Sequence, residues 1–436
     1  MNTTESHTVA YHTLGCKVNS YETEAVAEQM EKEGYERVPF SEKADIYIIN
    51  SCMVTIAAEA KTRQYARKPY RLNSDAIVVV MGCLSQLKAK RMLKIPGVKI
   101  VVGTKNREHI PEFIEQYMND PSPLNKVTGF DRDEAYDTLK IADFSHHQRA
   151  FLKIEDGCDN FCTYCIIPHT RGRVRSKPLD IVLSEARDLV ESGHKEIILT
   201  GIHTGAYGKD LPETSFSGLL KKLSMIEGLM NIRMSSIEVN ELTDDVIDVL
   251  ASSDKFVPHL HIPLQSGSDR ILKKMNRRYT TEGYASIIKN IRERLGDIAI
   301  TTDVIVGFPS EMDADYNTMV TFIKKMAFQG LHVFPFSPRK GTPAAEMNDQ
   351  VDDGEKKKRV KTLLALSKKM HLAYVKAHSG DIHEVIVERK QNDYLLGHTR
   401  DYIHVRFKGE ASSIGSMVRV RITQPSASLS EAMMVK

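Results

Sequence analysis

Four short apolar runs near the N-terminus constrain the fold most, because an amphipathic segment follows each of them. They lie at residues 7–15, 45–51, 76–82 and 98–103. The third run contains AIVVVM, which is apolar at every position, and such runs are typical of strands buried on both faces. A parallel sheet covered by helices on both sides buries its strands in this way. We therefore predict an N-terminal α/β domain with a doubly wound parallel sheet.

A second region continues the alternation of strand and helix. About six such units predict an open, partial (β/α)6 barrel, because about eight are needed to close a complete one. In barrels of this kind the active residues lie at the carboxyl ends of the strands. The predicted strands are residues 150–156, 195–202, 231–238, 259–265, 299–309 and 330–337.

The C-terminal part changes character after a long basic amphipathic helix predicted at residues 352–378. Short alternating runs separated by Gly, Ser and Asp follow it and predict a small all-β barrel of about 60 residues. Residues 119–149 have little pattern and predict a linker or surface loop with some docking contacts. We therefore predict three domains, at 1–145, 146–375 and 376–436.

The first of two cysteine sets follows the strands of the N-terminal domain. Cys16, Cys52 and Cys83 each come just after a predicted strand. Since the carboxyl ends of parallel strands meet at one edge of a sheet, these three thiols can converge there. Buried structural cysteines are the alternative interpretation, because free cysteine is often buried.

The second set is Cys158-x3-Cys162-x2-Cys165, in a loop directly after the first strand of the second region. Three close thiolates can bind three irons of a [4Fe–4S] cluster and leave the fourth iron open to a small chelating molecule. Structural zinc is the alternative, but it requires four ligands. Disulfides are a further alternative, but a large chain in a reducing compartment needs no covalent cross-link to be stable.

The N-terminus has no basic segment followed by an apolar run, and no run of about 18 apolar residues occurs. We therefore predict a cytoplasmic protein with no membrane segment. The net charge of +3 says little about nucleic acid by itself.

The loop IEDGCDNFCTYC, on the first strand of a partial barrel, resembles the radical-SAM superfamily. The resemblance implies that S-adenosylmethionine chelates the open iron and that an electron cleaves it to a 5′-deoxyadenosyl radical. Tyr164 also matches the superfamily pattern. Segments after the later strands resemble its cofactor contacts and imply that Gly201, Ser236, Glu238 and Gln265 bind S-adenosylmethionine.

The segments HTLGCKVNSYETE, INSCMVT and MGCLSQ, which contain Cys16, Cys52 and Cys83, resemble those of the methylthiotransferase family within that superfamily. This resemblance covers the whole chain. It implies an auxiliary [4Fe–4S] cluster on the first cysteine set, a radical-SAM barrel and a C-terminal TRAM domain that binds RNA. It also implies a reaction that uses two S-adenosylmethionine molecules, one for the methyl group and one for the radical.

Residues beside Cys16 resemble one branch of this family. Cys-Lys-Val-Asn is similar to the branch that modifies threonylcarbamoyladenosine, whereas the isopentenyladenosine branch tends to have Cys-Gln-Met-Asn. The expected reaction is methylthiolation at C2 of N6-threonylcarbamoyladenosine 37 in tRNA. One alternative is methylthiolation of N6-isopentenyladenosine in tRNA, since the segment FSPRKGTPAA partly resembles the branch that modifies this base. The other is a non-catalytic iron–sulfur RNA-binding protein.

Basic residues provide the candidate RNA contacts, since they can track phosphates. The expected partners are the tRNA anticodon stem-loop, an electron donor such as flavodoxin or ferredoxin, and a sulfur source. The principal candidates are Arg171, Arg173 and Arg175 after the cysteine loop and Arg406 and Lys408 near the C-terminus. Further basic clusters are Lys273, Lys274, Arg277 and Arg278, residues 356–359, and Arg419 and Arg421.

Overall fold

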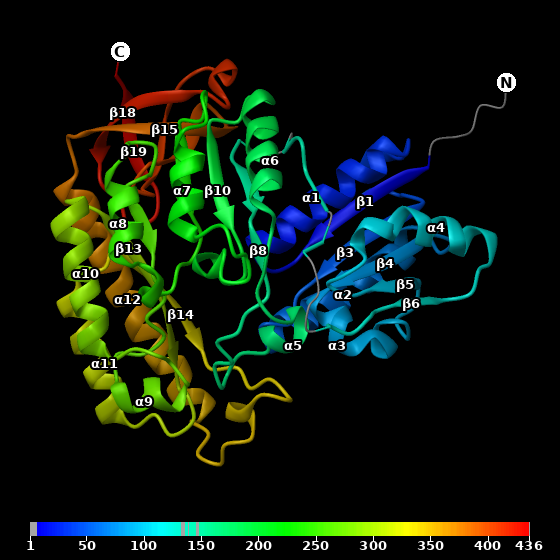
Figure 1. Ribbon diagram of the computed structural model, residues 1–436, viewed down its shortest axis with the longest axis horizontal. Helices are drawn as coiled ribbons and strands as arrows, with labels where there is room; N and C mark the ends of the chain where they lie inside the picture. The colour runs from blue at the N-terminus through cyan, green and yellow to red at the C-terminus, as the bar shows by residue number, and fades with distance from the viewer. Residues whose placement is uncertain (1–6, 132–135, 138, 145–147, 436) are drawn as a thin grey trace.

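The computed structural model describes residues 7–131, 136–137, 139–144 and 148–435 (Figure 1). Its N-terminal part is a parallel sheet with strand order β2-β1-β3-β4-β5-β6. The two edge strands, β2 and β6, are short and were not predicted. The strands are β1 Thr8–Thr13, β2 Glu36–Val38, β3 Ile46–Ser51, β4 Ile77–Gly82, β5 Val98–Val102 and β6 Leu124–Lys126.

Helices cover both faces of this sheet. Side chains alternate along β3, so that Ile46 and Ile48 belong to one core and Tyr47 and Ile49 to the other. Residues of α1 and α4 pack in the first core, and residues of α2 and α3 in the second. The prediction of a doubly wound sheet is therefore confirmed. The helices are α1 Lys17–Lys32, α2 Ile56–Leu72, α3 Cys83–Met92 and α4 Ile110–Asn119.

The central part is an open barrel of parallel strands with helices outside (Figure 1). Two three-stranded sheets, β11-β10-β7 and β12-β13-β14, meet through a parallel bridge between Ser236 and His261. The predicted partial barrel is therefore confirmed, with strands β7 Ala150–Lys153, β10 Glu196–Thr200, β11 Asn231–Met234, β12 His259–His261, β13 Ala299–Val306 and β14 Gly330–Pro335. The helices are α5 Ile167–Arg171, α6 Leu179–Glu191, α7 Phe216–Ser224, α8 Asp244–Ala251, α9 Asp269–Lys274, α10 Thr281–Leu295, α11 Asp313–Met326 and α12 Asp353–Ala377.

A closed barrel of five strands, in the order β15-β16-β17-β19-β18, ends the chain. The predicted all-β barrel is confirmed, although β19 was not predicted. The strands are β15 Ile382–Gln391, β16 Tyr394–Thr399, β17 His404–Lys408, β18 Met417–Gln424 and β19 Ser430–Met434. Short 3-10 helices are η1 Arg107–His109, η2 Thr204–Ala206, η3 Val239–Glu241, η4 Pro343–Ala345 and η5 Ala411–Ser413.

The first two parts share one apolar core. Leu139, Ile141 and Phe144 are buried and join sheet residues such as Ile48 to barrel residues such as Leu152. In the weakly patterned stretch, the described residues 139–144 therefore pack into the core that the sheet and the barrel share. We keep the three domains 1–145, 146–375 and 376–436 as a proposal, with α12 ending at Ala377, just past the second boundary. No helix in the described ranges is long and apolar enough to cross a membrane.

Candidate functional site

The second cysteine set lies in a loop bracketed by two short antiparallel strands, β8 Glu155–Asp156 and β9 Arg175–Ser176. Gly157 begins the loop with a φ of +91°, and an added Cβ there would lie 1.8 Å from the Arg173 carbonyl oxygen. Only glycine fits so close an approach. The loop is also fixed by Thr163, whose backbone N–H donates to the Met275 carbonyl at 3.1 Å and whose hydroxyl donates to the Lys274 carbonyl at 2.8 Å.

Cys158, Cys162 and Cys165 gather at this loop. Burial raises the pKa of Cys158 and the pKa of Cys165 to about 12, with smaller contributions of the same sign from the neighbouring thiols. Thiols in such surroundings become thiolates when a metal binds them. All six cysteines of the chain are free.

Charged side chains surround Cys162. The Arg277 guanidinium donates to the Cys162 Sγ at 3.4 Å and also pairs with Glu238. The His203 Nδ1 lies 3.8 Å from the Cys158 Sγ. A pocket of about 180 Å³, lined in part by Cys162, His203 and Glu238, opens beside the thiols.

Three thiols beside a polar pocket fit a [4Fe–4S] cluster: they would hold three of its irons, and the fourth would be open to a ligand from the pocket. The remaining cysteines of the chain belong to the other set, so this loop offers three thiolate ligands. Arg277 compensates the negative charge that the thiolates bring.

The predicted cofactor contacts lie around the same end of the barrel. Gly201 follows β10, and a Cβ there would lie 2.7 Å from the buried Glu155 Oε1. Ser236 is exposed after β11, and Glu238 is half-buried. Gln265 follows β12 with a φ of 62°. Their placement at strand ends leaves their role in binding S-adenosylmethionine as a proposal.

Tyr164 lies on the apolar side of the cysteine loop. Its ring meets the Phe308 ring edge to face, with centroids 6.5 Å apart. Tyr164 packs against a small core that includes Ile271, Met275 and Phe336. The side chain therefore anchors the loop, and a contact with the cofactor stays a prediction.

The first cysteine set converges at the carboxyl edge of the N-terminal sheet. Cys16 precedes α1, Cys52 follows β3 and Cys83 begins α3. Cys52 and Cys83 are buried, Cys16 is exposed, and the thiols interact electrostatically with one another. Burial raises the pKa of Cys52 to about 11. These thiols also fit a cluster with three cysteine ligands.

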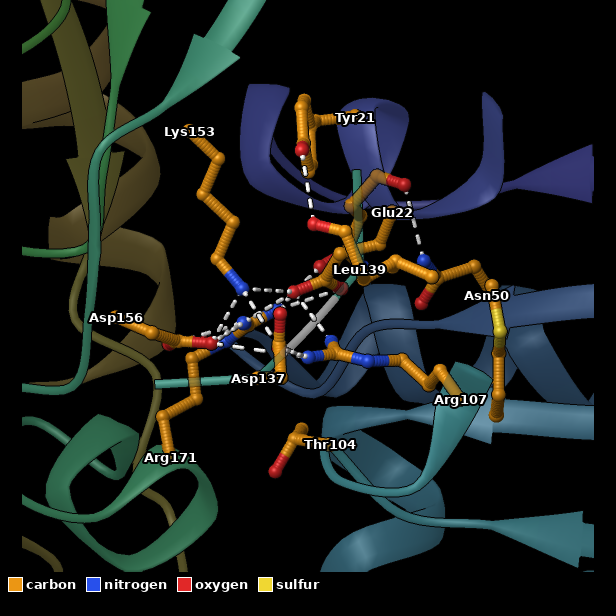
Figure 2. Close-up of polar contacts among 12 residues, drawn as sticks. Tyr21, Glu22, Asn50, Thr104, Arg107, Asp137, Leu139, Lys153, Asp156 and Arg171 are labelled. Carbon is orange, nitrogen blue, oxygen red and sulfur yellow. Dashed lines mark hydrogen bonds and ion pairs between the residues drawn. The ribbon is translucent and has the colours of Figure 1, made fainter. Parts of the chain in front are cut away.

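A buried ionic network joins this sheet to the barrel (Figure 2). The guanidinium of Arg171 lies at its centre, donating to the Glu22 Oε1 at 2.6 Å and to the Asp156 Oδ2 at 3.0 Å. Arg107 and Lys153, both fully buried, pair with Glu22 as well. These cations hold the pKa of Glu22 at about 2 in spite of burial. Arg171 also interacts electrostatically with Cys16, Cys52 and Cys83.

The prediction that Arg171 contacts RNA is therefore wrong, because this side chain is fully buried and paired. The same correction applies to Arg277, whose side chain is 4% exposed and pairs with Glu238, and to Lys356 and Arg359, which are buried against the barrel. Arg359 pairs with the buried Glu311. The sequence pattern could not distinguish these cations from solvated ones.

The other proposed RNA contacts differ in exposure. Arg173 is 63% exposed, and Lys408 is exposed on the C-terminal barrel. Arg175 is half-buried and donates to the carbonyls of Arg171 and Arg173. Arg406 is 41% exposed and pairs with Glu431. Contact of these four residues with RNA stays a prediction.

Known proteins share both halves of this arrangement. Residues 8–103 match the uncharacterized protein family UPF0004, and residues 152–323 match the radical SAM superfamily. The chain is 44% identical over 435 residues to the threonylcarbamoyladenosine tRNA methylthiotransferase MtaB of Bacillus subtilis (strain 168), an alignment that covers 98% of this chain and 96% of that protein. This chain belongs to the radical-SAM methylthiotransferase family. It is therefore a radical-SAM enzyme, and the cofactors of this superfamily are a [4Fe–4S] cluster and S-adenosylmethionine.

Further members of the family are less similar. The MtaB of Thermotoga maritima is 37% identical, over 95% of this chain and 94% of that protein. A tRNA-2-methylthio-N(6)-dimethylallyladenosine synthase of Clostridium botulinum (strain Langeland) is 36% identical, over 97% of this chain and 96% of that protein. The fold also resembles the radical S-adenosylmethionine methyltransferase TsrM of Kitasatospora setae, with a TM-score of 0.59, 14% identity, and coverage of 78% of this chain and 74% of that one.

Proposed function

We propose that this protein methylthiolates C2 of N6-threonylcarbamoyladenosine 37 in tRNA. The observation that carries the proposal is the 44% identity to an enzyme named for threonylcarbamoyladenosine, against 36% to one named for dimethylallyladenosine. The motif at Cys16, Lys17, Val18 and Asn19 supports the same branch.

The two cysteine sets support a reaction between two clusters. We propose that Cys158, Cys162 and Cys165 bind the cluster that supplies the electron for cleaving S-adenosylmethionine. Cys16, Cys52 and Cys83 would bind an auxiliary cluster where sulfur is presented. The reaction replaces the hydrogen on C2 by sulfur carrying a methyl group, so it consumes two S-adenosylmethionine molecules, one sulfur atom and electrons from a donor such as flavodoxin or ferredoxin.

The chain's own residues hold this site together. The Arg277 guanidinium donates a hydrogen bond to the Cys162 sulfur and so holds that side chain in the loop. Arg171 provides the matching positive charge for the first set while it is itself held by Glu22 and Asp156. Gly201, Ser236, Glu238, Gln265 and Tyr164 would orient S-adenosylmethionine at the strand ends.

The test is mass analysis of tRNA nucleosides from cells that lack the gene, with and without the gene restored. We expect 2-methylthio-N6-threonylcarbamoyladenosine to disappear and to return with the wild-type gene. If the methylthio-isopentenyl nucleoside is lost instead, the substrate assignment is wrong and the isopentenyladenosine branch is correct.

Cysteine variants of the purified enzyme assign the two sets in a second experiment. Replacing Cys158, Cys162 or Cys165 with Ala should abolish cleavage of S-adenosylmethionine by the purified enzyme. Replacing Cys16, Cys52 or Cys83 should leave cleavage in place and stop sulfur insertion. Cleavage at the wild-type rate in the Cys162→Ala variant would overturn the first assignment.

A further inference from the structure

Three side chains of metal-binding types lie together on one sheet of the central barrel. They are His261 on β12, Asp303 on β13 and His332 on β14, and these three strands are neighbours in a parallel sheet. The register pairs His332 with Asp303, and it pairs His261 with Thr301, two residues before Asp303. Because side chains alternate along a strand, the three side chains point to the same face of the sheet.

This face is the interior of the barrel. Ile300 and Val304 of β13 point the other way, into the core that they share with residues of α10 and α11. The Asp303 side chain is 25% exposed and that of His261 is 14% exposed, although both lie within the sheet. The interior therefore gives water, and an ion that water carries, access to these side chains.

The possible ligand atoms converge on one point. One nitrogen of each histidine and one oxygen of Asp303 all lie within 4.8 Å of one another. The His261 Nε2 lies 3.2 Å from the Asp303 Oδ1, and the ring centroids of His261 and His332 are 5.3 Å apart. Ligands at about 2.0–2.2 Å from a tetrahedral zinc ion lie roughly 3.3–3.6 Å from one another. Small side-chain rotations would therefore let the three atoms surround one ion.

Neighbouring groups orient one of the two rings and leave the other free. The Thr301 hydroxyl lies 2.9 Å from the His261 Nδ1 and can accept a hydrogen bond from it, which directs the Nε2 lone pair toward Asp303. The same hydroxyl lies 3.0 Å from the His259 Nε2, to which it can donate its own proton. Among the residues that the structure describes, the His332 ring forms no hydrogen bond or ion pair. Both rings can therefore offer a nitrogen lone pair to a metal.

Two imidazoles and one carboxylate suit a divalent transition metal. Imidazole nitrogen is a good ligand for Zn²⁺, whereas Mg²⁺ and Ca²⁺ prefer oxygen ligands. Zinc sites with three protein ligands of this kind keep a further coordination position open. The charges of Asp303 and Lys17 both act on His332, with opposite sign. The Asp303 carboxylate therefore has to supply the negative charge that holds a cation here.

We propose that His261, Asp303 and His332 bind one divalent transition-metal ion, for which Zn²⁺ is the best match, in the barrel interior. This ion is additional to the two iron–sulfur clusters and uses none of the cysteines. The open coordination position faces the interior, where water or an oxygen atom of a substrate can bind. The inference goes beyond the proposed function and does not depend on which base is modified.

The test is anaerobic equilibrium dialysis of the reconstituted holoenzyme against Zn²⁺, with zinc and iron measured in the same sample. Iron is measured because zinc that entered a cysteine site would displace it. The variants are Asp303→Asn and His332→Gln, which each remove a ligand, and Thr301→Val, which removes only the orienting hydroxyl. His109→Gln is the control, because His109 pairs with Glu112 at 2.7 Å in the N-terminal domain.

We expect wild type to bind one zinc ion per chain while its iron content stays at about eight, the content of two [4Fe–4S] clusters. Thr301→Val should weaken zinc binding roughly 10- to 100-fold, the usual cost of losing a group that orients a ligand. Asp303→Asn and His332→Gln should weaken it at least as much, and His109→Gln should bind zinc as wild type does. Zinc should also raise the melting temperature of wild type and not that of Asp303→Asn, because only an intact site binds it.

If wild type binds no zinc, His261 and Asp303 form only a hydrogen-bonded pair and the inference is wrong. It is also wrong if Asp303→Asn binds zinc as tightly as wild type does, or if zinc uptake is matched by loss of iron, which would place the zinc at the cysteines. Variants that lose iron together with zinc would show that these side chains only support the fold. None of these results changes the nucleoside analysis, so the proposed function stands or fails separately.

Discussion

At the scale of single residues, the buried carboxylates of the ionic network connect the N-terminal sheet to the barrel. Glu22 is fully buried among Arg107, Lys153 and Arg171. Such a network stabilises only while every member stays charged, because an unmatched buried charge is costly. The network therefore depends on each carboxylate being ionised.

We expect Glu22→Gln to lower the free energy of unfolding at pH 7 by about 3 kcal/mol or more, since it leaves buried cations short of one partner. The pH profile should change as well. The cations lower the pKa of Glu22 from 4.5 to about 2, so its stabilisation is fully present above pH 4.5 and is lost as the pH falls toward 2. Denaturant unfolding between pH 7 and pH 2 measures both effects.

The matched control is Glu293→Gln. Glu293 is 62% exposed and pairs with the exposed Lys289, so this change should alter stability by less than about 1 kcal/mol. An acid profile for Glu22→Gln as steep as that of wild type would show that another group controls acid unfolding.

At the scale of elements, the turn from β1 into α1 shapes the first cysteine set. Gly15 has a φ of +115°, and an added Cβ would lie 3.2 Å from the Cys52 Sγ and 2.9 Å from the Asn19 Nδ2. A side chain here would strain the backbone and displace Cys52. The turn therefore ties the geometry of Cys16 to that of Cys52.

We expect Gly15→Ala to prevent assembly of the auxiliary cluster while the other cluster forms. Reconstituted protein should then bind about four irons per chain instead of about eight, the difference of one [4Fe–4S] cluster. Iron analysis, with cleavage of S-adenosylmethionine as a second measurement, tests this. Gly34→Ala is the control, because Gly34 has a φ of +89° but nothing lies within 4 Å of an added Cβ. Equal iron loss in both variants would assign the effect to backbone strain alone.

At the scale of the whole molecule, the C-terminal barrel lies against the amino ends of the central strands. Arg233 of β11 donates to the Arg400 carbonyl at 3.1 Å, and its guanidinium lies over the Tyr402 ring. The cysteine loop lies at the carboxyl ends, toward α5 (Figure 1). A bound RNA that contacts both Arg173 and Lys408 would therefore extend from the cysteine loop to the C-terminal barrel.

We expect the double variant Arg173→Ala, Lys408→Ala to weaken binding of tRNA to a similar extent whatever the nucleotide sequence of the tRNA. The slope of log affinity against log salt should fall by about one for each phosphate that the variant no longer neutralises. Titrations at several salt concentrations measure this. Lys289→Ala is the control, because Lys289 is 76% exposed on the outer helix α10. An unchanged salt slope in the double variant would show that RNA binds another face.

The sequence by itself determined most of the helices and strands and the two cysteine sets. Continuous apolar runs predict strands such as β4, because burial on both faces of a sheet requires apolar side chains at every position. The same rule could not find β2 and β6, the short edge strands of the N-terminal sheet, or β19, the last strand of the chain. Each of these strands mixes polar and apolar residues. Cysteine spacing predicted the ligand loop because three close thiols have few other uses.

Tertiary structure decided which charges are buried. Arg171 and Arg173 are two residues apart in sequence, yet one is fully buried in the ionic network and the other is 63% exposed. Local sequence reports how a segment folds, whereas the charge that a side chain meets depends on segments that only the completed fold brings together.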